Sequence, residues 1–261
     1  MRSGVSLLLV DLVALARFVV VVTLVVTAFC ISNVFGISGE EILRKIDSNL
    51  NFRSAVMTAK MEIYLPGQPP RVKIFKSWVV GEQKAYVEFL NKEDKNIRYL
   101  KIGKQLWVYD KSENNTFLIS GHLLKQGMMG SDISYEDVLE SEDIYAKYSI
   151  TLEKEDSING RDCYVVSLKA KAENVSYYFR KMWVDKEYFI PLREEMFALS
   201  GRLLKVAEVE KVKSFGGKYY PTRSVVSDKL KENTKTVIEI QEANFDVSIL
   251  DSIFTKRHLE R

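Results

Sequence analysis

Short segments rich in β-branched and aromatic residues follow one another between residues 55 and 245 of the chain. Turn residues bound each segment, as they bound half-buried strands. Asn159-Gly160 and Gly216-Gly217 supply the positive φ angles of tight hairpin turns. About eleven strands, joined mainly by hairpins, predict one antiparallel meander. A sheet of this size curls into a barrel or splits into a sandwich, so the pattern predicts a mainly β fold.

Helical patterns are few. Ser38-Gly39-Glu40-Glu41 forms a capping box in front of an amphipathic stretch, Glu40–Leu50. Ser134-Tyr135-Glu136-Asp137 caps a short helix that runs through Leu139. A third helix is predicted over Val247–His258, where apolar residues recur at helical spacing.

The first 38 residues have the composition of an export signal. Arg2 precedes the uncharged apolar run Phe18–Ile31, and small and polar residues follow it. This order is that of a signal peptide. The alternative is a retained membrane anchor, because residues 18–37 are just long enough to span a bilayer. In both cases we expect residues 39–258 to be exported and to work as one domain in the periplasm or elsewhere in the cell envelope.

Cys30 lies in this apolar run and is a candidate lipidation site. A lipoprotein signal has a small residue directly before the acylated cysteine, whereas Phe29 stands there in this chain. The alternative is that Cys30 is an ordinary small apolar residue of the run. Cys163 alternates with Val165 in a strand-like segment, which predicts a buried thiol.

The charge balance argues against a nucleic-acid partner. The chain carries 38 Lys and Arg against 35 Asp and Glu, a formal net charge of +3. Nucleic-acid binding needs a basic excess that this composition lacks. The two histidines, His122 and His258, have no nearby set of metal-ligating residues. We therefore expect no nucleic acid, no metal and no cofactor.

Signatures of the familiar enzyme classes are missing from the sequence. It contains no G-x-S-x-G, H-E-x-x-H, Walker or dinucleotide-binding pattern. The neighbouring carboxylates of Glu194 and Glu195 point to opposite faces of a predicted strand, so they do not form a catalytic pair. The sequence thus predicts a binding protein and not an enzyme.

Apolar side chains on the strands exceed what a sheet with one buried face needs. The alternative is that most of them simply fill the core. The surplus predicts a curved sheet around a hydrophobic cavity. The glycine-flanked loop 127–131, with Met128 and Met129, predicts a mobile rim or lid over that cavity. The predicted lipid-contacting residues are Phe75, Trp78, Phe89, Trp107, Tyr109, Met128, Met129, Phe179 and Trp183.

Three segments resemble the LolA/LolB-like family of outer-membrane lipoprotein-sorting proteins. Residues 102–110, IGKQLWVYD, resemble its D-G-K-x-L-W-x-Y hairpin, in which strand alternation would place Trp107 and Tyr109 on one face and Leu106 and Val108 on the other. Residues 127–137, GMMGSDISYED, are similar to the M-M-G-S-D-x-S-Y-E-D signature of one branch. Residues 244–254 resemble the terminal D-x-S-x-F segment.

The resemblance covers nearly all of residues 39–258. It implies an antiparallel, incomplete β-barrel closed by a few helices, with a cavity for acyl chains. The implied function is a lipid or lipoprotein carrier or acceptor in outer-membrane lipoprotein sorting. Its partners would be acyl chains of lipoproteins or lipids, with an envelope membrane complex as a further candidate. The alternatives are an envelope sensor on the same half-barrel and an enzyme that uses the cavity.

Overall fold

The computed structural model describes residues 36–50, 52–139 and 144–261. Two units make up the chain, Met1–Ser38 and Gly39–Arg261. The predicted signal peptide or anchor, with Cys30, lies outside the described residues except for its last three positions. In the described ranges, no helix is both long enough and apolar enough to cross a membrane.

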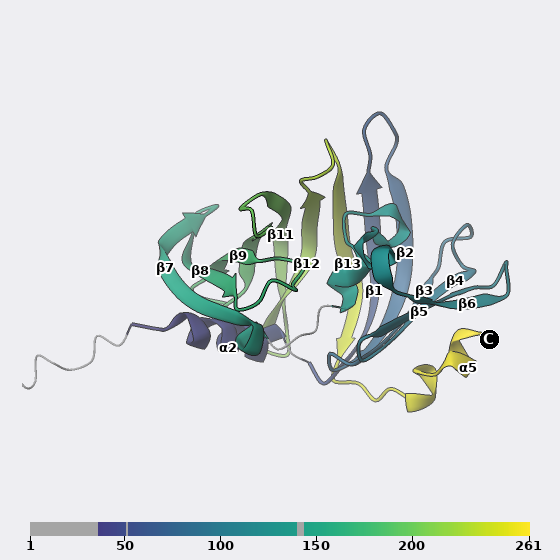
Figure 1. Ribbon diagram of the computed structural model, residues 1–261. Coiled ribbons are helices and arrows are strands. Elements are labelled where there is room, and N and C mark those ends of the chain that lie inside the picture. The colour runs from purple at the N-terminus through teal and green to yellow at the C-terminus, as the bar shows by residue number, and fades with distance from the viewer. Residues whose placement is uncertain (1–35, 51, 140–143) are drawn as a thin grey trace, which may run out of the picture. The chain divides into compact units, whose positions relative to one another are not determined.

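In the described part of Gly39–Arg261, thirteen antiparallel strands form a single sheet (Figure 1). Their order along the sheet is β6-β5-β4-β3-β2-β1-β13-β12-β11-β10-β9-β8-β7. The described sheet keeps two edges, β6 and β7, so the predicted incomplete barrel is confirmed, with thirteen strands instead of about eleven. The strands are β1 (Ser54–Tyr64), β2 (Arg71–Val80), β3 (Lys84–Phe89), β4 (Ile97–Ile102), β5 (Gln105–Asp110), β6 (Asn115–Ile119), β7 (Tyr148–Ile158), β8 (Arg161–Ala170), β9 (Phe179–Asp185), β10 (Pro191–Phe197), β11 (Leu203–Phe215), β12 (Lys218–Asp228) and β13 (Lys235–Phe245).

The connection between the edge strands decides where most helices lie. β6 and β7 follow each other in sequence but form opposite edges of the sheet. The described residues of this connection, 120–139 and 144–147, lie on one face of the sheet, and we name them the crossing segment and that face the inner face. The described helices of the crossing segment are η1 (Gly121–Lys125), η2 (Met128–Gly130), α3 (Tyr135–Leu139) and α4 (Ile144–Lys147).

Apolar strand side chains form the core under the crossing segment. Leu123, Met128 and Tyr135 are among the crossing residues that pack onto them. This inner cluster consists of Met61, Ile63, Phe89, Tyr99, Leu106, Val108 and Ile119, each at most 5% exposed. The first helix of the unit, α2 (Gly39–Leu50), buries Ile42, Leu43 and Ile46 and packs against β7 and β12 (Figure 1).

The C-terminal segment covers part of the opposite, outer face. It contains η3 (Asp251–Ile253) and α5 (Lys256–Leu259). Phe254 packs there onto Leu100 of β4 in a second buried cluster, the outer cluster. The predicted continuous helix over Val247–His258 is wrong, because the apolar residues of this stretch follow the sheet surface through short turns instead of forming one helical stripe.

The β4–β5 hairpin has the predicted register. Gly103 has a φ of 55°, which its tight turn requires. Trp107 and Tyr109 belong to the outer cluster, and Leu106 and Val108 belong to the inner cluster. The predicted alternation of this hairpin is therefore confirmed, and each face of the sheet is defined by named side chains.

Candidate functional site

The loop predicted as a rim or lid lies in the crossing segment. A Cβ atom at Gly127 would lie 1.9 Å from the carbonyl oxygen of Ser131, so this loop conformation requires glycine. Met128 and Met129 pack against the inner cluster, and the Tyr99 hydroxyl lies 3.3 Å from the Met129 sulfur, to which it donates. Both methionines thus add to the core of the inner face.

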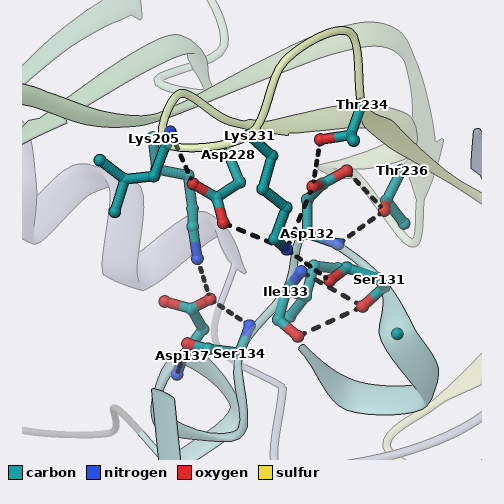
Figure 2. A network of polar contacts seen from close by, with 12 residues as sticks. Ser131, Asp132, Ile133, Ser134, Asp137, Lys205, Asp228, Lys231, Thr234 and Thr236 are labelled. Atoms are coloured by element: carbon teal, nitrogen blue, oxygen red, sulfur yellow. Dashed lines mark hydrogen bonds and ion pairs between the residues drawn. The ribbon is translucent and has the colours of Figure 1, made fainter. Parts of the chain in front are cut away.

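Asp132 joins the crossing segment to the β12–β13 hairpin, as Figure 2 shows. Its carboxylate accepts hydrogen bonds from the Thr234 hydroxyl at 2.7 Å and the Thr236 hydroxyl at 3.1 Å. Its backbone N–H donates to the Thr236 hydroxyl oxygen at 2.8 Å. The Lys231 ammonium lies 3.6 Å from this carboxylate and 3.1 Å from that of Asp228. The aspartate is 4% exposed, so these hydroxyl groups bind a buried carboxylate, while Lys231 is exposed.

Asp137 makes a second connection, to β11 (Figure 2). Its carboxylate accepts from the Ser134 N–H at 2.7 Å, and the Ser134 hydroxyl accepts from the Asp137 N–H at 3.2 Å, which confirms the predicted helix cap. The Tyr177 hydroxyl donates to the Asp137 carboxylate at 2.6 Å, and the Lys205 ammonium forms an ion pair with the same carboxylate. Burial alone would raise the pKa of Asp137, but Lys205 and these hydrogen bonds hold that pKa below its usual value.

Acid should remove the stabilisation that Asp137 provides. A carboxyl with a lowered folded-state pKa stabilises the fold fully above the unfolded value of about 4, and this stabilisation is lost as pH falls through the folded-state value. We expect Asp137→Asn to lower the free energy of unfolding most near neutral pH, with a difference from wild type that shrinks as the pH falls below about 4. Urea unfolding at a series of pH values measures this. A difference in the free energy of unfolding that stays constant over the pH series would contradict the lowered pKa of Asp137.

A pocket of about 800 Å³ opens between the inner face, α2 and the crossing segment. An in-register row of side chains forms one wall, because Ala55 pairs with Val79, Val79 with Ala85, and Ala85 with Lys101. A smaller pocket of about 200 Å³ adjoins it, and Val79 lines both. We name the two together the inner pocket. Its apolar lining also includes Leu50, Phe52, Met57, Val138, Ile144, Tyr220 and Phe245.

Charged side chains stand beside these apolar walls. The Arg180 guanidinium donates to the Glu194 carboxylate at 2.6 Å. The Lys101 ammonium donates to the Val138 carbonyl oxygen at 3.1 Å. The charged residues of the lining are Asp47, Glu82, Lys84, Lys101, Lys147 and Arg180. The pocket can therefore take a ligand with both an apolar and a charged part.

The predicted lipid-contacting residues are spread over both faces of the sheet. Phe75, Phe89, Met128 and Met129 lie in or against the inner cluster. Trp78, Trp107 and Tyr109 lie in or against the outer cluster, with the C-terminal segment. Phe179 and Trp183 alternate along β9 with Arg180, which lines the inner pocket, so their side chains point to the other face. Contact of these residues with lipid stays a prediction, and the structure does not bring them together at one site.

Small residues line part of the inner pocket, and none of them was among the residues predicted from the sequence to contact lipid. A cavity needs side chains that leave space, whereas aromatic rings on a strand fill it. Ala55 and Ala59 are both buried on the inner side of β1, with Met57 between them. Ala85 continues this face on β3. Small apolar residues at alternate positions were the signal that could have located the pocket.

Groups capable of covalent or metal chemistry are sparse in the described part of the chain. Cys163 is fully buried, as the strand alternation predicted, and burial raises the pKa of its thiol. Among residues 36–50, 52–139 and 144–261, no three His, Cys, Asp or Glu side chains are grouped to hold a metal ion.

Known proteins resemble this chain in sequence and structure. A family model for an uncharacterized protein matches residues 81–261. A DUF1329 family protein from Desulfovibrio piger is 24% identical with a TM-score of 0.77, over 85% of this chain and 97% of that one. A LolA superfamily protein from Nitrosomonas europaea is 24% identical with a TM-score of 0.69, over 86% and 100% of the two chains. The chain belongs to the family that this model describes, and its fold is LolA-like.

A third solved structure is also similar to this LolA-like chain. It is a proposed outer membrane lipoprotein-sorting protein domain from Vibrio parahaemolyticus, 21% identical with a TM-score of 0.74, over 85% and 98% of the two chains. At such identities the structural likeness establishes the fold, which is LolA-like and mainly β. No curated protein matches the chain.

Proposed function

We propose that this LolA-like protein binds acyl chains of lipids or lipoproteins in the inner pocket and takes part in outer-membrane lipoprotein sorting. The pocket is the observation that carries the proposal. Small-molecule sites usually have volumes of about 300–1,000 Å³ and mainly apolar walls. The larger part of the inner pocket, at about 800 Å³, lies in this range and has the apolar row from Ala55 to Ala85 along one side. The name of the Vibrio relative supports the assignment to lipoprotein sorting.

Burial of an acyl chain would supply enough free energy for reversible binding. Each buried methylene contributes roughly 0.8 kcal/mol, so ten of them contribute on the order of 8 kcal/mol before ordering costs. Such binding needs no covalent bond, and the proposal assigns binding without any chemical step. A carrier or acceptor must also release its ligand, and an affinity of this size permits release.

Export completes the proposal. Residues 1–38, as signal peptide or anchor, would deliver residues 39–258 to the periplasm or cell envelope, where lipoproteins and an envelope membrane complex are the partners. Mass spectrometry of the protein from its own envelope would show whether the N-terminus is cleaved or retained and whether Cys30 carries acyl chains.

Filling the inner pocket should weaken ligand binding. We expect Ala85→Trp to weaken binding of a neutral fluorescent acylglycerol at least about tenfold, because the indole would occupy the space of the chain. The measurement is titration of the purified protein, with circular dichroism to confirm the fold. Val72→Trp is the matched control, since Val72 is 41% exposed and lies on the other face of β2 from Val79.

Two outcomes would count against acyl-chain binding in the inner pocket. If the folded Ala85→Trp variant bound the probe as wild type does, the ligand would lie elsewhere. If wild type bound neither the probe nor a synthetic lipopeptide that competes with it, the LolA-like fold would serve another purpose in this protein.

A further inference from the structure

Lys101 ends the apolar row of the inner pocket. It pairs with Ala85 on one side and with Leu106 on the other, and Leu106 is 1% exposed. Lys101 itself is only 8% exposed. The chain thus places an ammonium group among apolar side chains, which is costly unless the charge finds acceptors.

The described part of the chain compensates this charge only in part. An ammonium has three hydrogens to donate. One of them reaches the Val138 carbonyl oxygen at 3.1 Å, while the described carboxylates lie beyond ion-pair distance of Lys101. Burial lowers the pKa of Lys101, and the charge of Glu82, which lines the same pocket, opposes this effect without cancelling it.

Two other cations of the lining have carboxylate partners. Arg180 pairs with Glu194 at 2.6 Å. Lys84 pairs with Asp251 at 2.9 Å. Their charges are already balanced within the protein, so Lys101 is the better candidate for a role in binding.

Occupation of the pocket changes the surroundings of Lys101. In the open pocket, water can accept the remaining hydrogen bonds of the ammonium. An acyl chain that fills the pocket displaces this water, and a ligand without an acceptor would leave the ammonium buried with one hydrogen bond. A ligand whose head group is an anion would supply both the acceptors and the opposite charge.

We infer that the inner pocket selects acyl ligands that carry an anionic head group, a carboxylate or a phosphate, and that Lys101 binds this head group. The inference rests on the proposed function and narrows its ligand class. The acyl chain would lie along the row Ala55, Val79 and Ala85, with the head group at the Lys101 end of the row.

Competition against a neutral fluorescent acylglycerol tests this selectivity in the full chain purified from the envelope. The competitors are palmitate, hexadecyl phosphate and hexadecanol, which share a chain length and differ in the head group. We expect either or both anions to compete at least about tenfold better than the alcohol, since hydrogen bonds to charged groups are among the stronger ones. A preference for palmitate over hexadecyl phosphate, or the reverse, identifies the head group.

Variants assign the preference to Lys101. Lys101→Met should reduce the preference for anions to less than about twofold, and Lys101→Arg should retain it. Lys111→Met is the matched control on an exposed turn and should bind as wild type does. Circular dichroism shows whether each variant is folded. If Lys101→Met does not fold, the preference of the wild type still decides whether the pocket selects anionic ligands.

Three results distinguish a failure of this inference from a failure of the proposed acyl-chain binding. Equal competition by anions and alcohol in wild type would overturn the inference and leave acyl binding intact. An unchanged preference in folded Lys101→Met would overturn the role of Lys101. If the neutral probe itself did not bind, the proposed function would fall, and the inference with it.

Discussion

Replacing Phe254 with alanine should lower the free energy of unfolding by about 3–5 kcal/mol. Phe254 is 5% exposed and packs in the outer cluster with Tyr86, Leu100 and Tyr109. These partners lie on β-strands whose positions are fixed by pairing on both sides, so the space left by the ring cannot close fully. Urea unfolding followed by tryptophan fluorescence measures the change, because Trp107 packs against the same cluster.

Leu250→Ala is the control for this prediction. Leu250 belongs to the same C-terminal segment but is 73% exposed, so its removal should change the free energy of unfolding by less than about 0.5 kcal/mol. If the two variants unfolded at the same urea concentration, the C-terminal segment would not be part of the folded core.

Strand positions could be predicted from the sequence because strand signals are local. Strand-like residues bounded by turn residues fill positions 71–80, 161–170 and 235–245 of the sequence, and β2, β8 and β13 occupy these positions. β9 is an exception, since the strand-like pattern of the sequence spans residues 175–184, whereas the strand begins at Phe179. Tyr177, just before it, turns its hydroxyl to Asp137, a contact with the crossing segment that no local pattern reveals.

Strand pairing and the location of the site could not be predicted in the same way. A simple meander would leave β1 at an edge, whereas β1 pairs with β13 and the edges are β6 and β7. That pairing places the crossing segment on the inner face and leaves room beside it for the pocket. These long-range contacts decide which apolar face of the sheet is covered by other segments of the chain and which face keeps a cavity.

The GMMGSDISYED signature illustrates the same limit. Its methionines suggested contact with lipid, and its acidic residues had no assigned role beyond the helix cap at Ser134–Asp137. In the structure Met128 and Met129 pack onto the inner cluster, while Asp132 and Asp137 connect the crossing segment to β13 and β11 (Figure 2). The polar residues of the signature therefore position the segment that forms one wall of the inner pocket.

Asp132→Ala should destabilise the protein by about 4 kcal/mol, because two hydrogen bonds to a charged acceptor are lost and two hydroxyl donors are left without it. Thr236 is fully buried, so water cannot easily replace the carboxylate there. Asp132→Asn keeps one oxygen acceptor in a side chain of the same shape and should lose about half as much. Urea unfolding of the three proteins at neutral pH measures both differences.

A double variant shows whether the loss arises from the bond to Thr236. Thr236→Val removes one of the two hydroxyl donors with little change of shape, so in Asp132→Ala/Thr236→Val only the Thr234 hydroxyl still faces the absent carboxylate. The double variant should therefore lose less stability than the two single variants together. Strictly additive losses would mean that the two side chains act separately, and that Asp132 holds the crossing segment through its other partners, Thr234 and Lys231.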